Sequence, residues 1–204
     1  MKVILLLAIC AFTMSAQRIV YTKVFPGSVP AYAKITITKA GALTYQEEAN
    51  EPEPDKVQLD PATTTTIFDL AAKLDFFKTK LESGLKVAKT GDKTYRWEDG
   101  STTNEAKYNY STDETARELQ LWFEHITESQ RILSDLERTY KYDRLGVNEI
   151  LVRLDGAWAQ KRVVAPAQFT TILDRIAKNE SLLNMARDRA AGLSEAFKAA
   201  AKPQ

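Results

Sequence analysis

A long amphipathic pattern in the second half of the chain limits the possible folds more than any other feature of the sequence. From Ser111 to Tyr140, apolar residues recur at spacings of three and four over roughly 28 residues, which predicts one helix with a single buried face. Ser111 and Glu114 fit a capping box at its start. Such a helix is expected to lie across a sheet or to form the spine of a bundle. Its buried face consists of Leu119, Trp122, Phe123, Ile126, Leu133, Leu136 and Tyr140.

The first half of the chain carries the alternating pattern of a β-sheet. Ala33, Ile35 and Ile37 alternate with polar residues, which predicts a half-buried strand over 32–39. A reversal at residues 40–41 joins this strand to the next in a hairpin. The other strands are expected over residues 18–24, 43–46, 94–98 and 105–110.

An acidic segment and several helix starts complete the pattern. Residues 47–55 are interpreted as a solvated connector broken by prolines; the alternative is a calcium-binding loop, but the carboxylate spacing matches no EF-hand. Asp60 as N-cap and Pro61 at the first helical position predict a helix that reaches Phe77. Further helices are expected after Gly146, with starts at Asn148, Pro166 and Asn179.

These elements together predict an α+β fold. An antiparallel sheet with packed helices is followed by an α-helical C-terminal region. We divide the chain into a leader at 1–16, a strand-rich part with one helix at 17–110, and a helical part at 111–204. The helical part is expected to pack on the strand-rich part as one compact unit.

The first sixteen residues, MKVILLLAICAFTMSA, have the pattern of a cleavable signal peptide. Lys2 supplies the positive start, and the apolar run that follows is too short to span a bilayer. Cleavage is expected after Ala16, which makes the protein exported, either periplasmic or secreted. Cys10 is the only cysteine and leaves with the signal, so the mature chain has no disulfide and no thiol nucleophile. Lipidation of Cys10 is the alternative, which the bulky Ile9 disfavours.

The charge balance and the absence of motifs exclude several functions. Without Lys2, the 28 basic residues fall to 27, equal to the 27 acidic residues, so the sequence has no electrostatic signature of nucleic-acid binding. No segment after the signal is apolar enough for a membrane span. The sequence contains no phosphate-binding glycine loop, dinucleotide fingerprint or zinc-protease motif. We therefore expect no cofactor and no metal.

Candidate catalytic residues are few or unspecific. His125 is the only histidine; with Glu128 it could position a general base, although a partly exposed helix residue is the favoured interpretation. Carboxylate catalysis needs only Asp and Glu, but nothing in the sequence brings two of them together, so we predict no catalytic residue. The candidates considered are Glu98, Asp99, Glu105, Glu118, Asp135, Asp143, Asp155 and Asp174.

Aromatic residues on the second strand pair are the one candidate binding site. Tyr95 and Trp97 share a face by the period of two, as do Tyr108 and Tyr110. Exposed, the four rings could stack on sugars or contact a partner protein. The favoured interpretation is that they pack in the core beneath the long helix, because large aromatic residues on a regular strand are usually buried. In that case the solvent face would carry Lys93, Arg96, Lys107 and Asn109.

Several short motifs carry a resemblance to a family. They are Gly41-x-x-x-Tyr45, Ile67-Phe68-Asp69-Leu70, Leu74-Asp75-Phe76-Phe77 and Lys107-Tyr108-Asn109-Tyr110 before Leu119 to Ile126. Over roughly residues 30–130 the chain resembles a class of uncharacterised exported bacterial domains. This resemblance implies an α+β domain of unknown role in a bacterial envelope.

The expected function is therefore that of a non-enzymatic binding or accessory protein outside the cytoplasm. Its partner would be a protein or an envelope component. The alternative is a carboxylate-dependent hydrolase that acts on envelope polysaccharide. A third possibility is an assembly role of the C-terminal helices.

Overall fold

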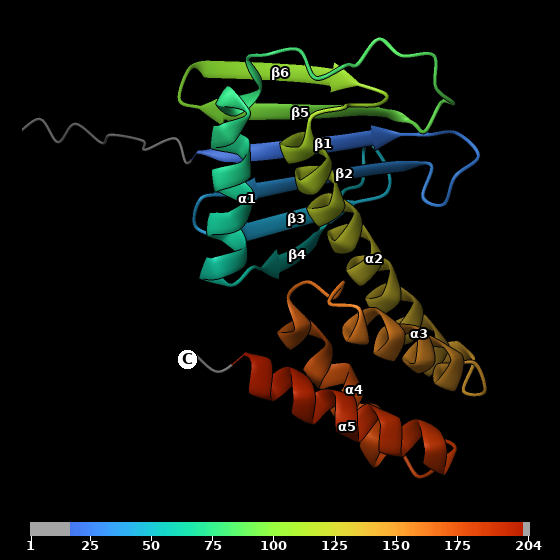
Figure 1. Ribbon diagram of the computed structural model, residues 1–204. Helices are drawn as coiled ribbons and strands as arrows, with labels where there is room; N and C mark the ends of the chain where they lie inside the picture. Colours follow the sequence, from blue (N-terminus) through green and yellow to red (C-terminus); the bar gives the residue numbers. More distant parts are fainter. Residues whose placement is uncertain (1–16, 202–204) are drawn as a thin grey trace, which may run out of the picture.

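The computed structural model describes residues 17–201, so the predicted signal peptide and Cys10 lie outside the described residues. Its first part is a six-stranded antiparallel sheet in the order β4-β3-β2-β1-β5-β6 (Figure 1). The strands are β1 (Arg18–Val24), β2 (Tyr32–Thr38), β3 (Ala42–Gln46), β4 (Asp55–Gln58), β5 (Asp92–Asp99) and β6 (Thr102–Tyr108). The sheet and the helical C-terminal region confirm the predicted fold class. Strand β4 is an addition at the end of the acidic segment.

Among residues 17–201, helices cover one face of the sheet and leave the other open. Strand β1 lies near its centre, where Tyr21 is opposite Ile35 on β2 and Tyr95 on β5. These three side chains are at most 1% exposed, whereas their sequence neighbours on the other face remain partly accessible. Helix α1 (Pro61–Lys73) and the first half of α2 (Glu114–Tyr142) cross the buried face (Figure 1). The alternation predicted from sequence is thus the alternation between core and solvent.

The first two helices begin at aspartates. The carboxylate of Asp60 accepts a hydrogen bond from the backbone N–H of Thr63 at 2.9 Å, which confirms the predicted start of α1. After α1, a 3₁₀ turn, η1 (Asp75–Phe77), inserts the Phe77 ring into the core. Helix α2 is 29 residues long, as its apolar pattern predicted, but its N-cap is Asp113, so the capping box predicted at Ser111 is wrong.

Helices α3 (Val147–Ala159), α4 (Thr170–Lys178) and α5 (Asn184–Ala200) form the C-terminal region with the 3₁₀ turn η2 (Pro166–Phe169). Pro166 opens η2 as expected, but the two asparagine caps are wrong. Asn148 lies inside α3, and Asn179 ends α4 and accepts a hydrogen bond from the N–H of Ser181. A short amide side chain suits a turn after a helix as well as the start of one.

Two hydrophobic cores share the long helix α2. Its first half, with Leu119, Phe123 and Ile126, packs with the sheet and α1. Its second half, with Ile132 and Leu136, packs with α3, α4 and α5. We call these two parts the sheet lobe and the helical lobe (Figure 1). The division between the two cores falls inside α2, whereas the sequence placed it before this helix.

A polar contact in the middle of α2 joins the lobes. The buried Ser129 hydroxyl oxygen accepts a hydrogen bond from the N–H of Val164 at 2.9 Å. The side-chain amide of Gln130 donates to Gln168, and the Gln168 amide donates to the carbonyl of Val164, each at 3.0 Å. Val164 and Ala165 belong to the core of the sheet lobe. The segment before η2 therefore fastens the helical lobe to the sheet lobe.

We predict that Phe123→Ala lowers the free energy of unfolding by about 3–5 kcal/mol, because it leaves a cavity in the first core. Phe123 is fully buried and its ring stacks on that of Tyr21 at a centroid distance of 4.5 Å. Unfolding in urea, followed by circular dichroism, measures the change. The matched control is Leu121→Ala on the same helix, where the side chain is 52% exposed and the expected loss is under about 0.5 kcal/mol. Equal losses in the two variants would contradict the assigned packing.

Candidate functional site

The predicted aromatic patch is not exposed. Tyr95 is 0% exposed, and Trp97 and Tyr108 are each 4% exposed, beneath the helices and η1. The Tyr95 hydroxyl donates a hydrogen bond to the carbonyl of Ala116 on α2 at 3.1 Å. Tyr110 lies just beyond β6 and is half-buried. The exposed patch of Tyr95, Trp97, Tyr108 and Tyr110 is therefore overturned, and three of these rings belong to the core, as the favoured interpretation expected.

Lys93 also lies on the opposite face from the one predicted. It shares the core face of β5 with Tyr95, because residues two apart on a strand point the same way. Its ammonium donates hydrogen bonds to the carbonyls of Asn109 (2.8 Å) and Gly91 (3.2 Å) and to the hydroxyl of Thr90 (3.0 Å). Burial lowers the pKa of this lysine. Lys93 is thus a buried cation whose ammonium group is hydrogen-bonded to neighbouring carbonyl and hydroxyl oxygens.

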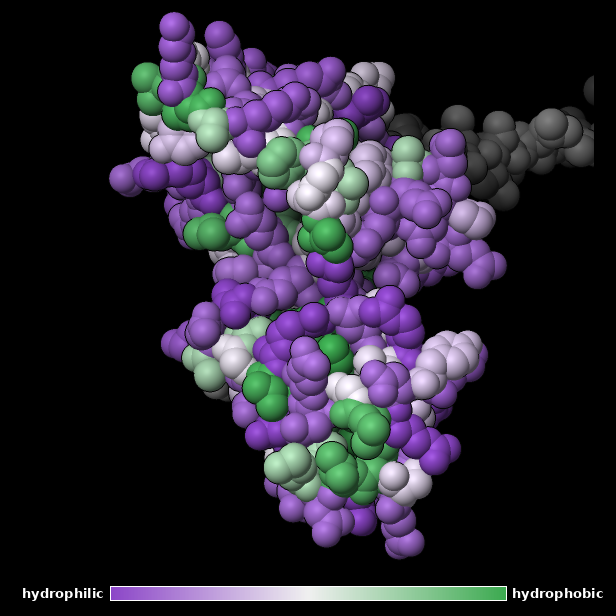
Figure 2. All heavy atoms as spheres, turned by 90° about the vertical axis from the view of Figure 1, so that its right-hand side faces the viewer, coloured by the Kyte–Doolittle hydropathy of each residue, from purple (hydrophilic) through white to green (hydrophobic). Residues whose placement is uncertain are grey.

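A polar cleft lies where β1 ends beside α2. We call it the Tyr21 cleft; it has a volume of about 330 Å³. Tyr21 and Lys23 come from the core face of β1, and the loop from β1 to β2 supplies a second wall. Hydrophilic residues dominate the surface between the two lobes on this side of the molecule (Figure 2). The residues from α2 that line the cleft are Glu124, Thr127, Glu128, Arg131 and Ile132.

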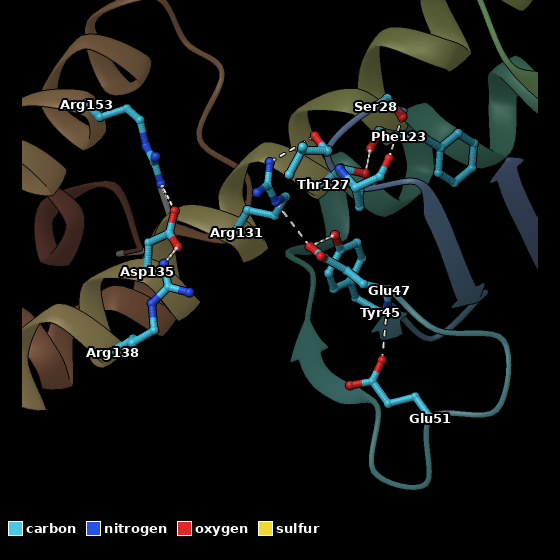
Figure 3. Close-up of polar contacts among 12 residues, drawn as sticks. Ser28, Tyr45, Glu47, Glu51, Phe123, Thr127, Arg131, Asp135, Arg138 and Arg153 are labelled. Atoms are coloured by element: carbon cyan, nitrogen blue, oxygen red, sulfur yellow. Dashed lines mark hydrogen bonds and ion pairs between the residues drawn. The ribbon is translucent and has the colours of Figure 1, made fainter. Parts of the chain in front are cut away.

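Arg131 holds the loop wall of the cleft in place. Its guanidinium donates a hydrogen bond to the carbonyl of Val29 at 3.0 Å and forms an ion pair with Glu47 at 3.2 Å (Figure 3). Inside the loop, the hydroxyl of Ser28 donates to the carbonyls of Phe25 and Pro30, each at 2.7 Å. The loop is therefore fixed both by its own hydrogen bonds and by α2.

The hydroxyl of Tyr21 is buried without a hydrogen-bond partner among residues 17–201. Burial holds the pKa of Tyr21 well above its ordinary value, and Tyr108 and Glu124 raise it further, so the phenol is neutral at physiological pH. A buried polar group without a partner costs about 1–3 kcal/mol. Such groups are rare in native proteins and point to a missing water or ligand.

Most charged side chains of the Tyr21 cleft are already in ion pairs with residues outside it. These pairs fix the rim of the cleft and neutralise its charge in part. The pairs are Arg131 with Glu47 (3.2 Å), Arg153 with Asp135 (2.5 Å), and Glu128 with Arg162.

Two charged side chains of the cleft have no ion pair in the described structure. Within the described part of the chain, neither Lys23 nor Glu124 has an ion-pair partner within 4.0 Å. Glu124 accepts one hydrogen bond, from the neutral side chain of Gln120 at 2.7 Å. The cleft thus presents one cation and one anion that are not paired with each other.

A second pocket of about 290 Å³ adjoins the first across Arg131. We call it the acidic pocket, because the segment predicted as a solvated connector directs Glu47, Glu51 and Asp55 into it. The hydroxyl of Tyr45 donates to Glu47 at 2.7 Å, and the backbone N–H of Glu47 donates to Glu51 at 3.0 Å (Figure 3). Burial raises the pKa of Asp55, and the carboxylates of Glu51 and Glu47 raise it further.

The carboxylates singled out by the sequence do not converge. Asp135 lines the acidic pocket, where it binds Arg138 and Arg153 (Figure 3). Glu98 and Glu105 lie together on the open face of the sheet and pair with Arg96. Among residues 17–201, no group of three or more His, Cys, Asp or Glu is arranged to hold a metal ion.

His125 is half-buried on α2, in line with the favoured interpretation of a partly exposed helix residue, and the alternative pair with Glu128 is not formed. Glu128 binds Arg162 instead. Burial lowers the pKa of His125; Glu128 raises it and Arg162 lowers it, with a net decrease. The imidazole is therefore neutral at pH 7.

No family model, curated protein or solved structure matches the chain. The resemblance over residues 30–130 therefore stays a prediction. In the described part of the chain, no helix combines the length and the apolar character needed to cross a membrane.

Sequence reasoning missed the Tyr21 cleft because its walls come from distant segments. The alternation that starts at Ile19 places Tyr21 and Lys23 on the core face, and this was the one available signal. A lysine at a core-facing position of a strand, two residues after a tyrosine on the same face, would have marked the end of β1 as a candidate site.

We predict that Tyr21→Phe leaves the free energy of unfolding of the ligand-free protein unchanged or raises it, because it removes a hydroxyl that has no partner. The control is Tyr95→Phe, which loses the hydrogen bond to Ala116 and should lower the free energy by about 1 kcal/mol. Both rings lie in the same core, so the changes in the free energy of unfolding, measured by chemical denaturation, can be compared directly. A loss in Tyr21→Phe as large as that in Tyr95→Phe would show that the Tyr21 hydroxyl has a partner.

Proposed function

We propose that the protein is an exported, non-enzymatic binding protein that holds a small polar ligand in the Tyr21 cleft. The observation that carries the proposal is the buried Tyr21 hydroxyl without a partner, in a cleft where Lys23 and Glu124 lack ion pairs. A ligand that fills the cleft would supply partners to these groups. Its source would be the envelope or the medium around the cell.

The size and rigidity of the cleft support binding of a small molecule. A volume of about 330 Å³ lies at the lower end of the range for ligand pockets. The cleft walls come from β1 and α2, and Arg131 fastens the loop between them. Such a preformed site binds without a large cost of ordering.

The hydroxyl groups of the cleft favour binding over catalysis. The hydroxyl of Thr127 donates to the carbonyl of Phe123 at 2.9 Å, and that of Ser28 donates to backbone carbonyls. A nucleophilic hydroxyl needs instead a neighbouring base that accepts its proton. These two groups act as structural donors.

The start of β1 is compatible with export. Strand β1 begins at Arg18, and the carbonyl of Gln17 accepts a hydrogen bond from the N–H of Lys39 at 2.9 Å. Cleavage after Ala16 would thus leave the first strand and this contact intact. The periplasm or the exterior is the proposed location.

For export, we predict that the protein recovered outside the cytoplasm begins at Gln17, as read by intact mass and N-terminal sequencing. Ala16→Leu should leave the precursor uncleaved, because the processing site requires a small residue. Ala11→Leu, within the apolar run, should be processed normally. A cytoplasmic protein that retains Met1 would contradict the export proposal.

For binding, we predict that purified protein captures a small molecule from an extract of the envelope, detected by native mass spectrometry. Thr127→Met should lower the bound fraction at least tenfold, because the longer side chain fills the cleft. Thr139→Met is the matched control, since Thr139 on the same helix makes the same type of hydrogen bond to its own backbone and lies outside the cleft. Capture that is unaffected by Thr127→Met would place the ligand elsewhere.

The acidic pocket favours a second candidate function, a carboxylate-dependent hydrolase of envelope polysaccharide. The raised pKa of Asp55 suits a general acid, and the side chain of Glu47 or Glu51 would serve as base or nucleophile. Release of reducing ends from cell-wall polysaccharide tests this function. Asp55→Asn should abolish it and Thr127→Met should not; an inactive wild-type protein would exclude it.

A further inference from the structure

From the two charged side chains of the Tyr21 cleft that have no ion pair in the described structure, and resting on the proposed function, we infer that the ligand is zwitterionic, an amino acid or a short peptide. Lys23 would bind its carboxylate and Glu124 its ammonium group. The two side chains line one cleft, on β1 and α2, without an ion pair between them in the described structure.

Lys23 is the available cation of the cleft. It is half-buried at the last core-facing position of β1, opposite Lys93 on β5. Lys93 is also close to Glu124, but its ammonium is already hydrogen-bonded to two backbone carbonyls and a hydroxyl. The two cations therefore differ in function. Lys93 is a structural group, whereas Lys23 is free to bind an anionic group.

Glu124 is the available anion. It is half-buried on α2 and accepts a hydrogen bond from Gln120, whose carbonyl oxygen in turn accepts from the hydroxyl of Tyr108 at 3.3 Å. This chain of neutral donors orients the carboxylate without neutralising it. An ammonium group has three donors and satisfies such a carboxylate.

A desolvation argument selects a zwitterion over a singly charged ligand. A ligand that fills the cleft displaces water from both Lys23 and Glu124. A ligand with one charge would pair with one of them and leave the other desolvated and unpaired, which is strongly unfavourable. A ligand with both charges compensates both groups. The apolar wall of Val29, Pro30 and Ile132 would then contact a short aliphatic side chain.

The experiment uses calorimetric titration of the protein from Gln17 onward with the twenty common L-amino acids and with L-alanyl-L-alanine. The tightest binder is then compared with its analogue that lacks the amino group and with its analogue that lacks the carboxylate. We expect the zwitterion to bind at least tenfold more tightly than either analogue. Lys23→Gln and Glu124→Gln should each weaken it at least tenfold. The matched controls are Lys34→Gln on the open face of the sheet and Glu137→Gln on the exposed side of α2, both with unchanged binding.

The outcomes separate the ligand class from the proposed function. An analogue with one charge that binds as tightly as the zwitterion overturns the zwitterion inference. The inference is also overturned if no zwitterion in the set binds while a molecule from the envelope extract does bind, and if Thr127→Met abolishes the binding of that molecule. In both cases the binding function stands. If neither the zwitterions nor the extract yields a bound molecule, the proposed function itself fails. Thermal unfolding midpoints of the variants equal to that of the wild-type protein show that the variants are folded.

Discussion

The middle turn of α2, residues 128–131, is the constraint on which the rest of the structure depends. Successive helix residues are rotated by about 100°, so four in a row point to all sides of the helix. Three of the four side chains contact the segment at residues 162–168, and the fourth contacts the β1–β2 loop and the acidic segment. The contacts are Glu128 with Arg162, Ser129 with the N–H of Val164, Gln130 with Gln168, and Arg131 with Val29 and Glu47. This turn therefore fixes the rotation of α2 and the orientation of both lobes relative to it.

The same turn explains why the clefts lie between the lobes. The apolar face of α2 ends in the first core at Ile126 and resumes in the second at Ile132. Between them, Ser129 and Gln130 are buried, and each makes a hydrogen bond through its side chain. These polar side chains interrupt the apolar face of α2, and the two apolar clusters on either side of them are separate. The Tyr21 cleft and the acidic pocket occupy the space that results, with Arg131 as their common wall.

Local sequence patterns predicted the helices and strands, whereas the Tyr21 cleft is formed by contacts between residues far apart in the sequence. The strand at Arg18–Val24 and the length of α2 follow from periodicity, which depends on neighbouring residues alone. The period of two also shows that Tyr95 and Trp97 share a face, but it does not show which face a helix covers, and so it left both the exposed patch and the core open. Arg131 and Val29 are 102 residues apart, and no local pattern brings them together. Asn179 illustrates a third limit, because its side chain serves equally well at either end of a helix.

The core around Tyr21 gives the strongest physical reason to assign binding to this region. The ring of Tyr21 stacks on Phe123 and lies beside Tyr95, contacts that a phenylalanine would make as well. Its hydroxyl adds no hydrogen bond inside the described structure and carries the desolvation cost of a buried polar group. Packing alone therefore does not account for a tyrosine at this position. A bound molecule or an ordered water that reached this hydroxyl would account for the tyrosine, because it would restore the missing hydrogen bond in a cleft where Lys23 and Glu124 lack ion pairs.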